Sequence, residues 1–238
     1  DAAALRRECA LLRTLFLKSK NNRKEPFQMD TNHITADLPA RIRDAERVLV
    51  GLGTEWGAGS GRDLKPAYEA LAKLLEGKDY FIVTVNVDGQ IYDSPLDGKR
   101  ITAPCGNLHW YQCQAACTTD IWEEGEVADG KCPHCGAPLI PNTIEAEHYI
   151  EEGYLISWRE YTAWLSRTLN RRLEVLELGA GVRMRELQVL RWPLEKTVFF
   201  NNKAHMYRIN ETFPQISDEI QTKAEAVKEN SVEFVEKL

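Results

Sequence analysis

The sequence lacks the features that several broad classes of protein require. No apolar run approaches the roughly 18 residues that a membrane-spanning helix needs. Basic residues show no surplus either, because 30 lysines and arginines face 36 acids and the net charge is −6. Nucleic-acid-binding proteins usually carry such a surplus, and the short basic stretch at residues 18–24 does not supply it. We therefore expect neither a membrane nor a nucleic acid as a partner.

We also expect no secretory signal, since the charged first residues of the sequence show no cleavage-site pattern. Clustered cysteines in a chain without such a signal favour a reducing cytoplasm and metal binding over disulfides. With 238 residues and 43% hydrophobic residues, the chain has the length of one large domain, or of a domain with a small module. We therefore expect a cytoplasmic globular protein.

Four of the six cysteines form two close pairs, in a C-x3-C segment and a C-P-H-C-G segment. They are Cys113, Cys117, Cys132 and Cys135. Two close pairs separated by a short excursion are typical of a tetrahedral thiolate site for Zn²⁺. The alternatives are two disulfides or unrelated free thiols. The spacing predicts a structural zinc module, which by itself supplies no chemistry.

Strand and helix patterns alternate along the rest of the chain. Runs rich in β-branched residues predict buried strands at residues 47–53, 80–86, 101–103, 174–179, 197–202 and 207–210. Helical spacing predicts helices at residues 36–46, 66–75, 158–172 and 216–237. This alternation is typical of an α/β fold, a Rossmann-like doubly wound parallel sheet. The cysteine module would be inserted into it.

We divide the chain accordingly. The predicted sheet domain comprises residues 29–104 and 140–212, with the zinc module at 105–139 and a C-terminal helix at 213–238. Residues 1–28 would be an N-terminal helical extension, because Met29 lies shortly before the next helix and could be a true start. Whether that extension belongs to the native protein stays open.

Polar and glycine-rich segments follow the predicted strands. In a doubly wound sheet, ligands bind beyond the carboxyl ends of the strands. G-L-G-T-E-W-G follows the first strand, N-V-D-G-Q the second, and G-A-G the third. Glycines let the backbone approach phosphates, although each segment alone could equally be a plain turn. Together, these strand ends favour a nucleotide site.

Four segments together resemble the sirtuins: T-V-N-V-D-G at 84–89, C-G-N-L-H-W-Y-Q-C at 105–113, E-L-G-A-G at 177–181 and R-I-N at 208–210. In that family a Rossmann-like NAD-binding domain carries an inserted four-cysteine zinc module. The resemblance covers about residues 36–212. It is closest to the divergent microbial branch that is encoded beside macrodomain proteins.

The resemblance implies NAD as the cofactor and gives roles to the residues at the strand ends. Those near the diphosphate would be Gly51, Gly53, Thr54 and Glu55. Asn86 would hold the nicotinamide ribose and Asp88 the carboxamide. Those around the adenosine half would be Gly179, Gly181 and Asn210.

Cys105 stands where deacylating sirtuins carry a histidine that acts as general base. Together with Asn86 and Asp88 it completes our candidate catalytic set. A thiol acts as base or nucleophile only if its surroundings lower its pKa. The macrodomain-linked branch also lacks the histidine, so its absence argues against deacylation more than against ADP-ribosyl transfer. His109 could substitute, although a place at the rim of the zinc module suits it better.

The segment between Gly53 and Asn86 is short, whereas sirtuins carry a long cofactor-binding loop and a small helical module there. That loop shields the nicotinamide from water, so shortening it weakens the case for efficient catalysis. We expect a protein that transfers ADP-ribose from NAD to a protein substrate and releases nicotinamide. The alternatives are a degenerate sirtuin that binds NAD or ADP-ribose without turnover, an NAD-dependent deacylase, or a structural zinc protein.

Overall fold

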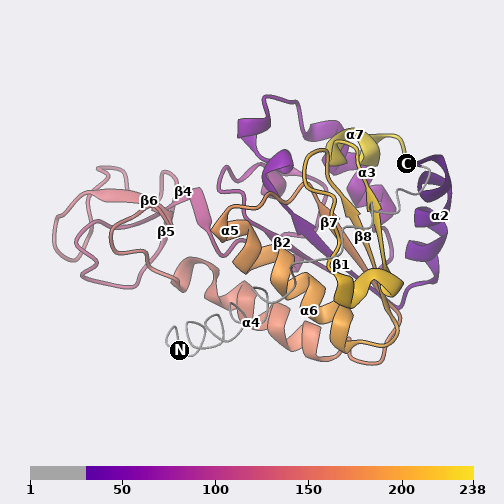
Figure 1. The fold of residues 1–238 in the computed structure, drawn as a ribbon. Coiled ribbons are helices and arrows are strands. Elements are labelled where there is room, and N and C mark those ends of the chain that lie inside the picture. Colours follow the sequence, from indigo (N-terminus) through magenta and orange to yellow (C-terminus); the bar gives the residue numbers. More distant parts are fainter. Residues whose placement is uncertain (1–30) are drawn as a thin grey trace.

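The computed structural model describes residues 31–238, so the predicted extension at 1–28 lies outside the described residues. Its centre is a six-stranded sheet in the order β3-β2-β1-β7-β8-β9, in which every neighbouring pair is parallel (Figure 1). The strands are β1 (Arg47–Leu52), β2 (Tyr80–Thr84), β3 (Ile101–Thr102), β7 (Leu173–Leu178), β8 (Ala204–Ile209) and β9 (Ala224–Val227).

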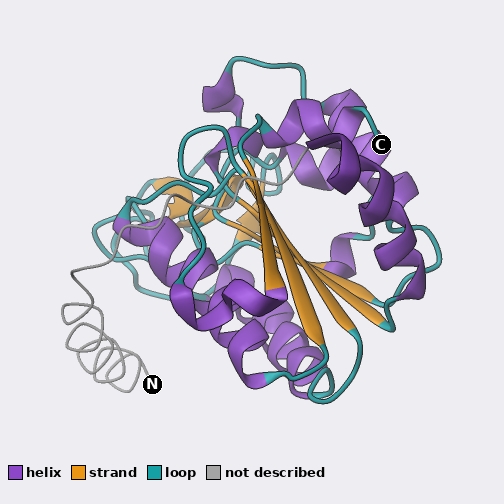
Figure 2. Cartoon of the chain, turned by 45° about the vertical axis from the view of Figure 1, so that its right-hand side comes forward, coloured by secondary structure: helices purple, strands orange, loops and turns teal. Residues whose placement is uncertain are grey.

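Helices cover both faces of this sheet (Figure 2). One face packs against α2 (Thr31–Asp44), α3 (Lys65–Leu74) and α7 (Ser231–Glu236). The other packs against α4 (Glu152–Ser166) and α6 (Trp192–Phe200). A short helix α5 (Met184–Glu186) and a π-helical turn (Leu187–Arg191) lead into α6. Strands that are covered on both faces read as apolar runs, which is why the sequence pattern found them.

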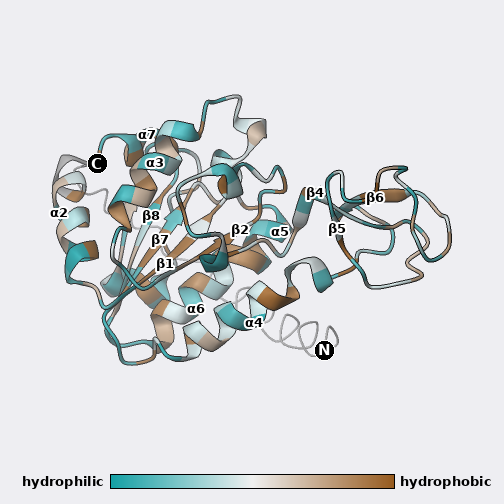
Figure 3. Ribbon diagram, turned by 180° about the vertical axis from the view of Figure 1, so that it is seen from behind, coloured by the Kyte–Doolittle hydropathy of each residue, from teal (hydrophilic) through white to brown (hydrophobic). Residues whose placement is uncertain are grey.

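Figure 3 shows the hydrophobic residues along β1 and β2 that result from this double cover. Every residue of β7, and every residue of β1 after Arg47, is buried. Short 3₁₀ turns at Thr54–Trp56, Ala58–Ser60, Gln90–Asp93 and Gly98–Arg100 shape the connections on the β1 and β2 side. Among the described residues, none of the helices combines the length and the apolar character that crossing a membrane would take.

A second, antiparallel sheet in the order β5-β4-β6 builds the cysteine module, which extends from the α/β body (Figure 1). Its strands are β4 (Gly106–Cys113), β5 (Trp122–Glu123) and β6 (Leu139–Thr143). Because β4 begins directly after Cys105, the segment that joins the module to the large sheet is also the segment that holds the candidate base. The predicted α/β fold with an inserted four-cysteine module is confirmed.

The strand predicted at residues 197–202 is wrong, because this segment belongs to α6. Pro193 occupies the first turn, where its fixed φ suits a helix. Leu190, Leu194 and Val198 are buried at a spacing of four residues, which is a helical period. The β-branched and aromatic residues that suggested a strand lie on both sides of this apolar stripe.

The single helix predicted at residues 216–237 is also wrong. The segment contains a 3₁₀ helix (Asp218–Lys223), the edge strand β9 and the short helix α7. Pairing with the edge of β8 overrides the helical propensity of Ala224–Val227. The Asn230 carboxamide oxygen then caps α7 by accepting hydrogen bonds from the amides of Val232 and Glu233.

A buried ion-pair network joins β7, β8 and α6. Glu177 and Arg208 are 0% and 1% exposed, and both guanidinium contacts to the carboxylate are short, at 2.6 and 2.7 Å. Arg191 contacts the same carboxylate at 3.3 Å, and Glu195 accepts from Arg208 at 2.7 Å. Such a network is costly to break from one side only, because the remaining charge is left without a partner.

Candidate functional site

Most of the residues predicted to bind the cofactor come together at the carboxyl ends of β1, β2, β7 and β8. The order of the sheet changes direction between β1 and β7, since β2 lies on one side of this pair and β8 on the other. This topological switch point is where open α/β sheets bind ligands. Gly53, Asn86, Gly179 and Asn210 all lie just beyond these strand ends.

The turns after β1 and β7 are in direct contact. A Cβ atom on Gly53 would lie 2.2 Å from the Ala180 Cα atom. Gly179 has a φ of +66°, and a Cβ atom there would lie 2.4 Å from the Glu55 Cβ atom. Both positions therefore require glycine. Gly51 differs, because it lies inside β1 and faces Leu194, where a Cβ atom would come within 2.6 Å of that side chain.

The N-V-D-G segment is bonded to the loop after β1. The Asn86 side-chain amide donates to the Gly53 carbonyl at 2.9 Å. The Asp88 carboxylate accepts from the Ala58 amide at 2.7 Å and from the Gln90 amide at 3.1 Å. Both residues are half-buried and lie at the carboxyl end of the sheet. The structure thus brings Asn86 and Asp88 beside the first glycine turn, as the sequence predicts.

Glu55 and Asn210 lie at the same edge with their polar atoms already engaged. The Glu55 carboxylate accepts from the Ser231 amide at 2.7 Å, from the Ser231 hydroxyl at 2.6 Å and from the Glu211 amide at 3.1 Å. Asn210 donates to the Ala180 carbonyl at 2.7 Å. Through these contacts, both residues hold together the loops at the carboxyl end of the sheet. This structural role is independent of any contact with a ligand.

Sequence reasoning missed two residues of this site, Glu186 and Ser231. Glu186 is 1% exposed, and its carboxylate accepts from the Gly181 amide at 2.6 Å and from the Thr54 hydroxyl at 2.9 Å. Ser231 also accepts from the Trp56 indole at 2.9 Å. The helix-capping residue before Ser231 could have indicated a helix start there, whereas no pattern in the sequence singles out Glu186.

Cys105 is 1% exposed and lies in the apolar layer between the sheet and α4. Burial raises the pKa of its thiol to about 12, the nearby Arg185 lowers it, and Glu186 and Glu145 raise it further. The thiol is therefore neutral near pH 7. A neutral, buried thiol is a poor base and a poor nucleophile, so the geometry does not support the catalytic role that the sequence suggested for Cys105.

We expect the Cys105→Ser variant to keep any NAD-dependent activity within about threefold of the wild type, because a neutral thiol contributes little to proton transfer. Peptide-level mass spectrometry should also show that iodoacetamide labels Cys105 about a thousandfold more slowly than in the denatured chain. A hundredfold loss of activity in Cys105→Ser, together with rapid labelling at pH 7, would contradict this assignment.

His109 lies beside the N-V-D-G turn. A Cβ atom on Gly89 would lie 2.8 Å from its ring, and its Nδ1 atom is 2.5 Å from the Glu124 carboxylate. The hydrogen bond with Glu124 raises the pKa of His109. Because this pair is exposed and favours the charged imidazolium, His109 is a weak candidate for a general base at neutral pH.

The four cysteine sulfurs lie within 4.8 Å of one another in the module. Three of the sulfur pairs are 3.5 Å apart. Zinc–sulfur bonds of about 2.3 Å in a tetrahedron place sulfurs about 3.8 Å apart, so the cluster fits Zn²⁺. The left-handed Gly136 (φ +76°) follows the second pair and closes its turn with a 2.8 Å bond to the Cys132 carbonyl. The cluster could therefore hold zinc.

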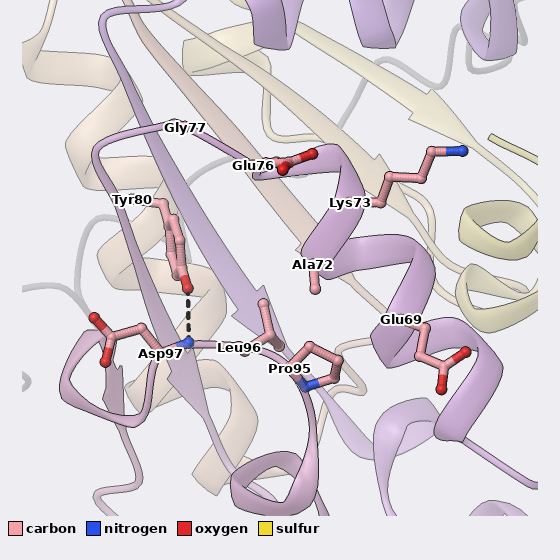
Figure 4. Close-up of a pocket in the computed structure, with 9 residues that line it drawn as sticks. All are labelled: Glu69, Ala72, Lys73, Glu76, Gly77, Tyr80, Pro95, Leu96 and Asp97. Atoms are coloured by element: carbon pink, nitrogen blue, oxygen red, sulfur yellow. Dashed lines mark hydrogen bonds between the residues drawn. The ribbon is translucent and has the colours of Figure 1, made fainter.

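A cavity of about 440 Å³ lies between α3 and the segment before β3, at the opposite end of the sheet (Figure 4). Tyr80 begins β2 there, and its hydroxyl accepts from the Asp97 amide at 3.0 Å. The other charged residues in its lining are Glu69, Lys73 and Glu76. This predominantly acidic lining does not suit a phosphorylated ligand, so we place the candidate site at the glycine turns.

Two curated proteins are similar in sequence, while no family model matches the chain. A Fusarium oxysporum f. sp. cubense protein, named a probable bifunctional ADP-ribose hydrolase/ADP-ribosyltransferase, is 26% identical over 155 residues. The match covers 56% of this chain and 26% of that protein. A Staphylococcus aureus (strain Mu50) protein ADP-ribosyltransferase is 24% identical over 173 residues, 65% of this chain and 54% of that protein. The chain thus spans about a quarter and about half of these relatives.

Solved structures of two mutants of a Sir2 homologue in complex with ADP-ribose share the fold. Their TM-scores are 0.58 and 0.57 at 15% identity, and each match covers 87% of this chain and 94% of the other. At this identity the likeness concerns the arrangement of the elements, and it extends over nearly the whole described chain.

Proposed function

We propose that this chain, which is sirtuin-like in its fold, uses NAD to transfer ADP-ribose to a protein substrate and releases nicotinamide. Its fold is that of Sir2 homologues whose solved structures contain ADP-ribose. Both curated relatives have names that include ADP-ribosyltransferase. The proposal assigns the reaction to the edge of the sheet where β1, β2 and β7 end.

One observation carries the proposal: the bonding of the N-V-D-G segment to the first glycine turn at the switch point of the sheet. Asn86 contacts Gly53 and Asp88 contacts Ala58, so two polar side chains are held beside the backbone that would accept a diphosphate. A Cβ atom on Gly57 would lie 2.6 Å from the Asn86 carboxamide oxygen, so a larger residue there would displace this side chain. This arrangement fits the ribose and diphosphate of NAD.

In the proposed reaction, a nucleophilic side chain of the protein substrate forms a bond to C1′ of the nicotinamide ribose. The bond from C1′ to the nicotinamide nitrogen breaks, and nicotinamide leaves with its electron pair. The acceptor loses its proton to solvent or to a base. Asn86 would orient the ribose, while Asp88 would keep the loop at Ala58 in place through its 2.7 Å hydrogen bond.

Cys105 favours transfer over deacylation. Deacylation by the sirtuin route needs a base at the position of Cys105, and the buried neutral thiol does not provide one. Transfer to an external acceptor has no such requirement at this position. We therefore propose ADP-ribosyl transfer in preference to deacylation.

Exposed apolar side chains near the site support a protein as the acceptor. Ile144, Val182 and Met184 are 38%, 45% and 54% exposed. Arg185 and Glu145 form an ion pair of 3.7 Å, which joins the segment of Val182 and Met184 to the segment of Ile144. Exposed apolar groups at the rim of a site are typical of surfaces that receive another protein.

The test is nicotinamide release from NAD, together with mass spectrometry of candidate protein substrates for an added ADP-ribosyl group. We expect both signals from the wild type and a loss of at least about a hundredfold in Asn86→Ala, because the ribose would lose its orienting amide. Glu69→Gln, which lies on α3 outside the site, is the matched control and should retain full activity. Absence of both products in the wild type would overturn the proposal.

A second candidate function is binding of NAD or ADP-ribose without turnover. The buried, neutral Cys105 thiol and the short segment between Gly53 and Asn86 favour it, because the thiol supplies no general base and a short segment shields the nicotinamide poorly from water. Calorimetry that shows tight NAD binding by a protein that releases no nicotinamide would support this function. Failure to bind any adenine nucleotide would instead leave a structural zinc protein.

A further inference from the structure

Three hydrogen-bond donors in the turns after β1 and β7 already bind a side chain. They are the Thr54 amide, the Thr54 hydroxyl and the Gly181 amide, and we call them the cradle. Glu186 accepts from the Gly181 amide at 2.6 Å, from the Thr54 hydroxyl at 2.9 Å and from the Thr54 amide at 3.4 Å. A Cβ atom on Gly181 would lie 2.6 Å from the same carboxylate. An anion thus already lies in contact with the backbone of both turns.

The position of this carboxylate coincides with the place where the fold receives an anionic ligand. Backbone amides at the ends of β1 and β7, at the switch point, suit a phosphate group. Glu186 is 1% exposed, so its charge is held away from water by these donors. A diphosphate and the Glu186 carboxylate carry the same sign and need the same donors, so the two cannot occupy the cradle together.

The residues just before Glu186 are largely exposed. Val182 and Met184 are 45% and 54% exposed, so moving them would sacrifice little buried apolar surface. The π-helical turn Leu187–Arg191 follows Glu186 directly, and such turns are frequent at functional sites. Glu186 is therefore a buried carboxylate between an exposed segment and a π-helical turn.

We propose that the Glu186 carboxylate is an internal competitor of the cofactor diphosphate, which must displace it from the Thr54 and Gly181 donors before it can bind. Glu186 thereby sets the affinity of the site for NAD and ADP-ribose. This inference rests on the proposed function for its ligand, while the cradle itself would accept any compact polyphosphate anion once the carboxylate is removed.

Glu186→Gln removes the charge with almost no change in size, and Glu186→Ala also removes the acceptor. Glu145→Gln is the control, because it removes one exposed carboxylate together with its ion pair to Arg185 but leaves Glu186 and the Thr54 and Gly181 donors in place. Calorimetry with ADP-ribose and thermal shift with inorganic pyrophosphate report binding without any turnover. Circular dichroism establishes that each variant is folded.

We expect both Glu186 variants to bind ADP-ribose at least about tenfold more tightly than the wild type and Glu145→Gln. Pyrophosphate should stabilise the two Glu186 variants and leave the wild type unchanged. Equal or weaker binding of ADP-ribose by folded Glu186→Gln would overturn the inference and leave the proposed function intact. Binding of pyrophosphate by the variants, with no binding of ADP-ribose by any protein, would support the cradle and contradict the proposed function.

The wild type provides a test that needs no variant. If ADP-ribose displaces Glu186, hydrogen exchange in residues 182–187 should become faster on binding, while the amides of Thr54 and Gly181 stay protected by the ligand. Slower exchange in residues 182–187 on binding would show that the carboxylate stays in place, and it would overturn the inference.

Discussion

Replacing Cys132 by serine is expected to remove bound zinc from the module, from about one equivalent per chain to nearly none. Cys132 is buried and packs with Cys113 and Trp122, so three remaining thiolates cannot retain both the metal and the small core around it. Zinc binding to such sites contributes about 10–16 kcal/mol in isolated zinc peptides, and here it would stabilise a module whose own hydrophobic core is small. Elemental analysis and thermal unfolding of the purified variant measure both effects.

Cys105→Ser is the matched control for this change. Cys105 is as buried as Cys132 but lies outside the four-cysteine cluster, so its replacement should leave the zinc content unchanged. A Cys132→Ser variant that keeps a full equivalent of zinc, or a wild type that never binds zinc, would contradict the assignment of the module as a zinc site.

The second large effect is expected at the buried network around Glu177. Glu177→Gln removes the carboxylate that Arg208 and Arg191 both contact, and it leaves Arg208, which is 1% exposed, with Glu195 as its remaining ion-pair partner among the described residues. Breaking a buried pair from one side costs about 3–5 kcal/mol. Urea denaturation should therefore show a loss of that size in the free energy of unfolding.

An exposed ion pair supplies the comparison. Arg62 and Glu233 are 2.7 Å apart, with side chains 40% and 44% exposed, so Arg62→Gln should change stability by no more than about 1 kcal/mol. Equal losses in Glu177→Gln and Arg62→Gln would show that the buried network contributes no more than a surface contact.

The sequence predicts the sheet well because buried parallel strands have a strong pattern. β1 and β2 are almost continuous apolar runs, β7 is an apolar run interrupted by Glu174 and Glu177, and all three strands form at the predicted runs. The edge strand β9 has no such pattern, and its pairing with β8 holds Ala224–Val227 extended. Helix α6 contains β-branched and aromatic residues, which favour a strand. Buried apolar residues nevertheless recur every four positions from Leu190 to Val198, and this helical pattern outweighs the strand propensity.

The candidate site was predictable only where its residues directly follow a strand in the sequence. Asn86, Asp88 and the glycines lie next to strands in the sequence, so topology alone brings them together. Glu186 reaches the same place through a short helix whose geometry no local pattern encodes. The properties of Cys105 also come from its surroundings, because the sequence specifies a thiol, while its burial between α4 and the sheet is the main cause that raises its pKa.

We propose that the turns after β1, β2 and β7 together bind the ADP-ribosyl part of NAD. A crystal structure of the chain with ADP-ribose is the decisive test. We expect the diphosphate against the Thr54 and Gly181 amides and a ribose within hydrogen-bond distance of Asn86. A ligand bound instead in the cavity beside Tyr80 and Asp97, or a site that stays empty at saturating ADP-ribose, would contradict it.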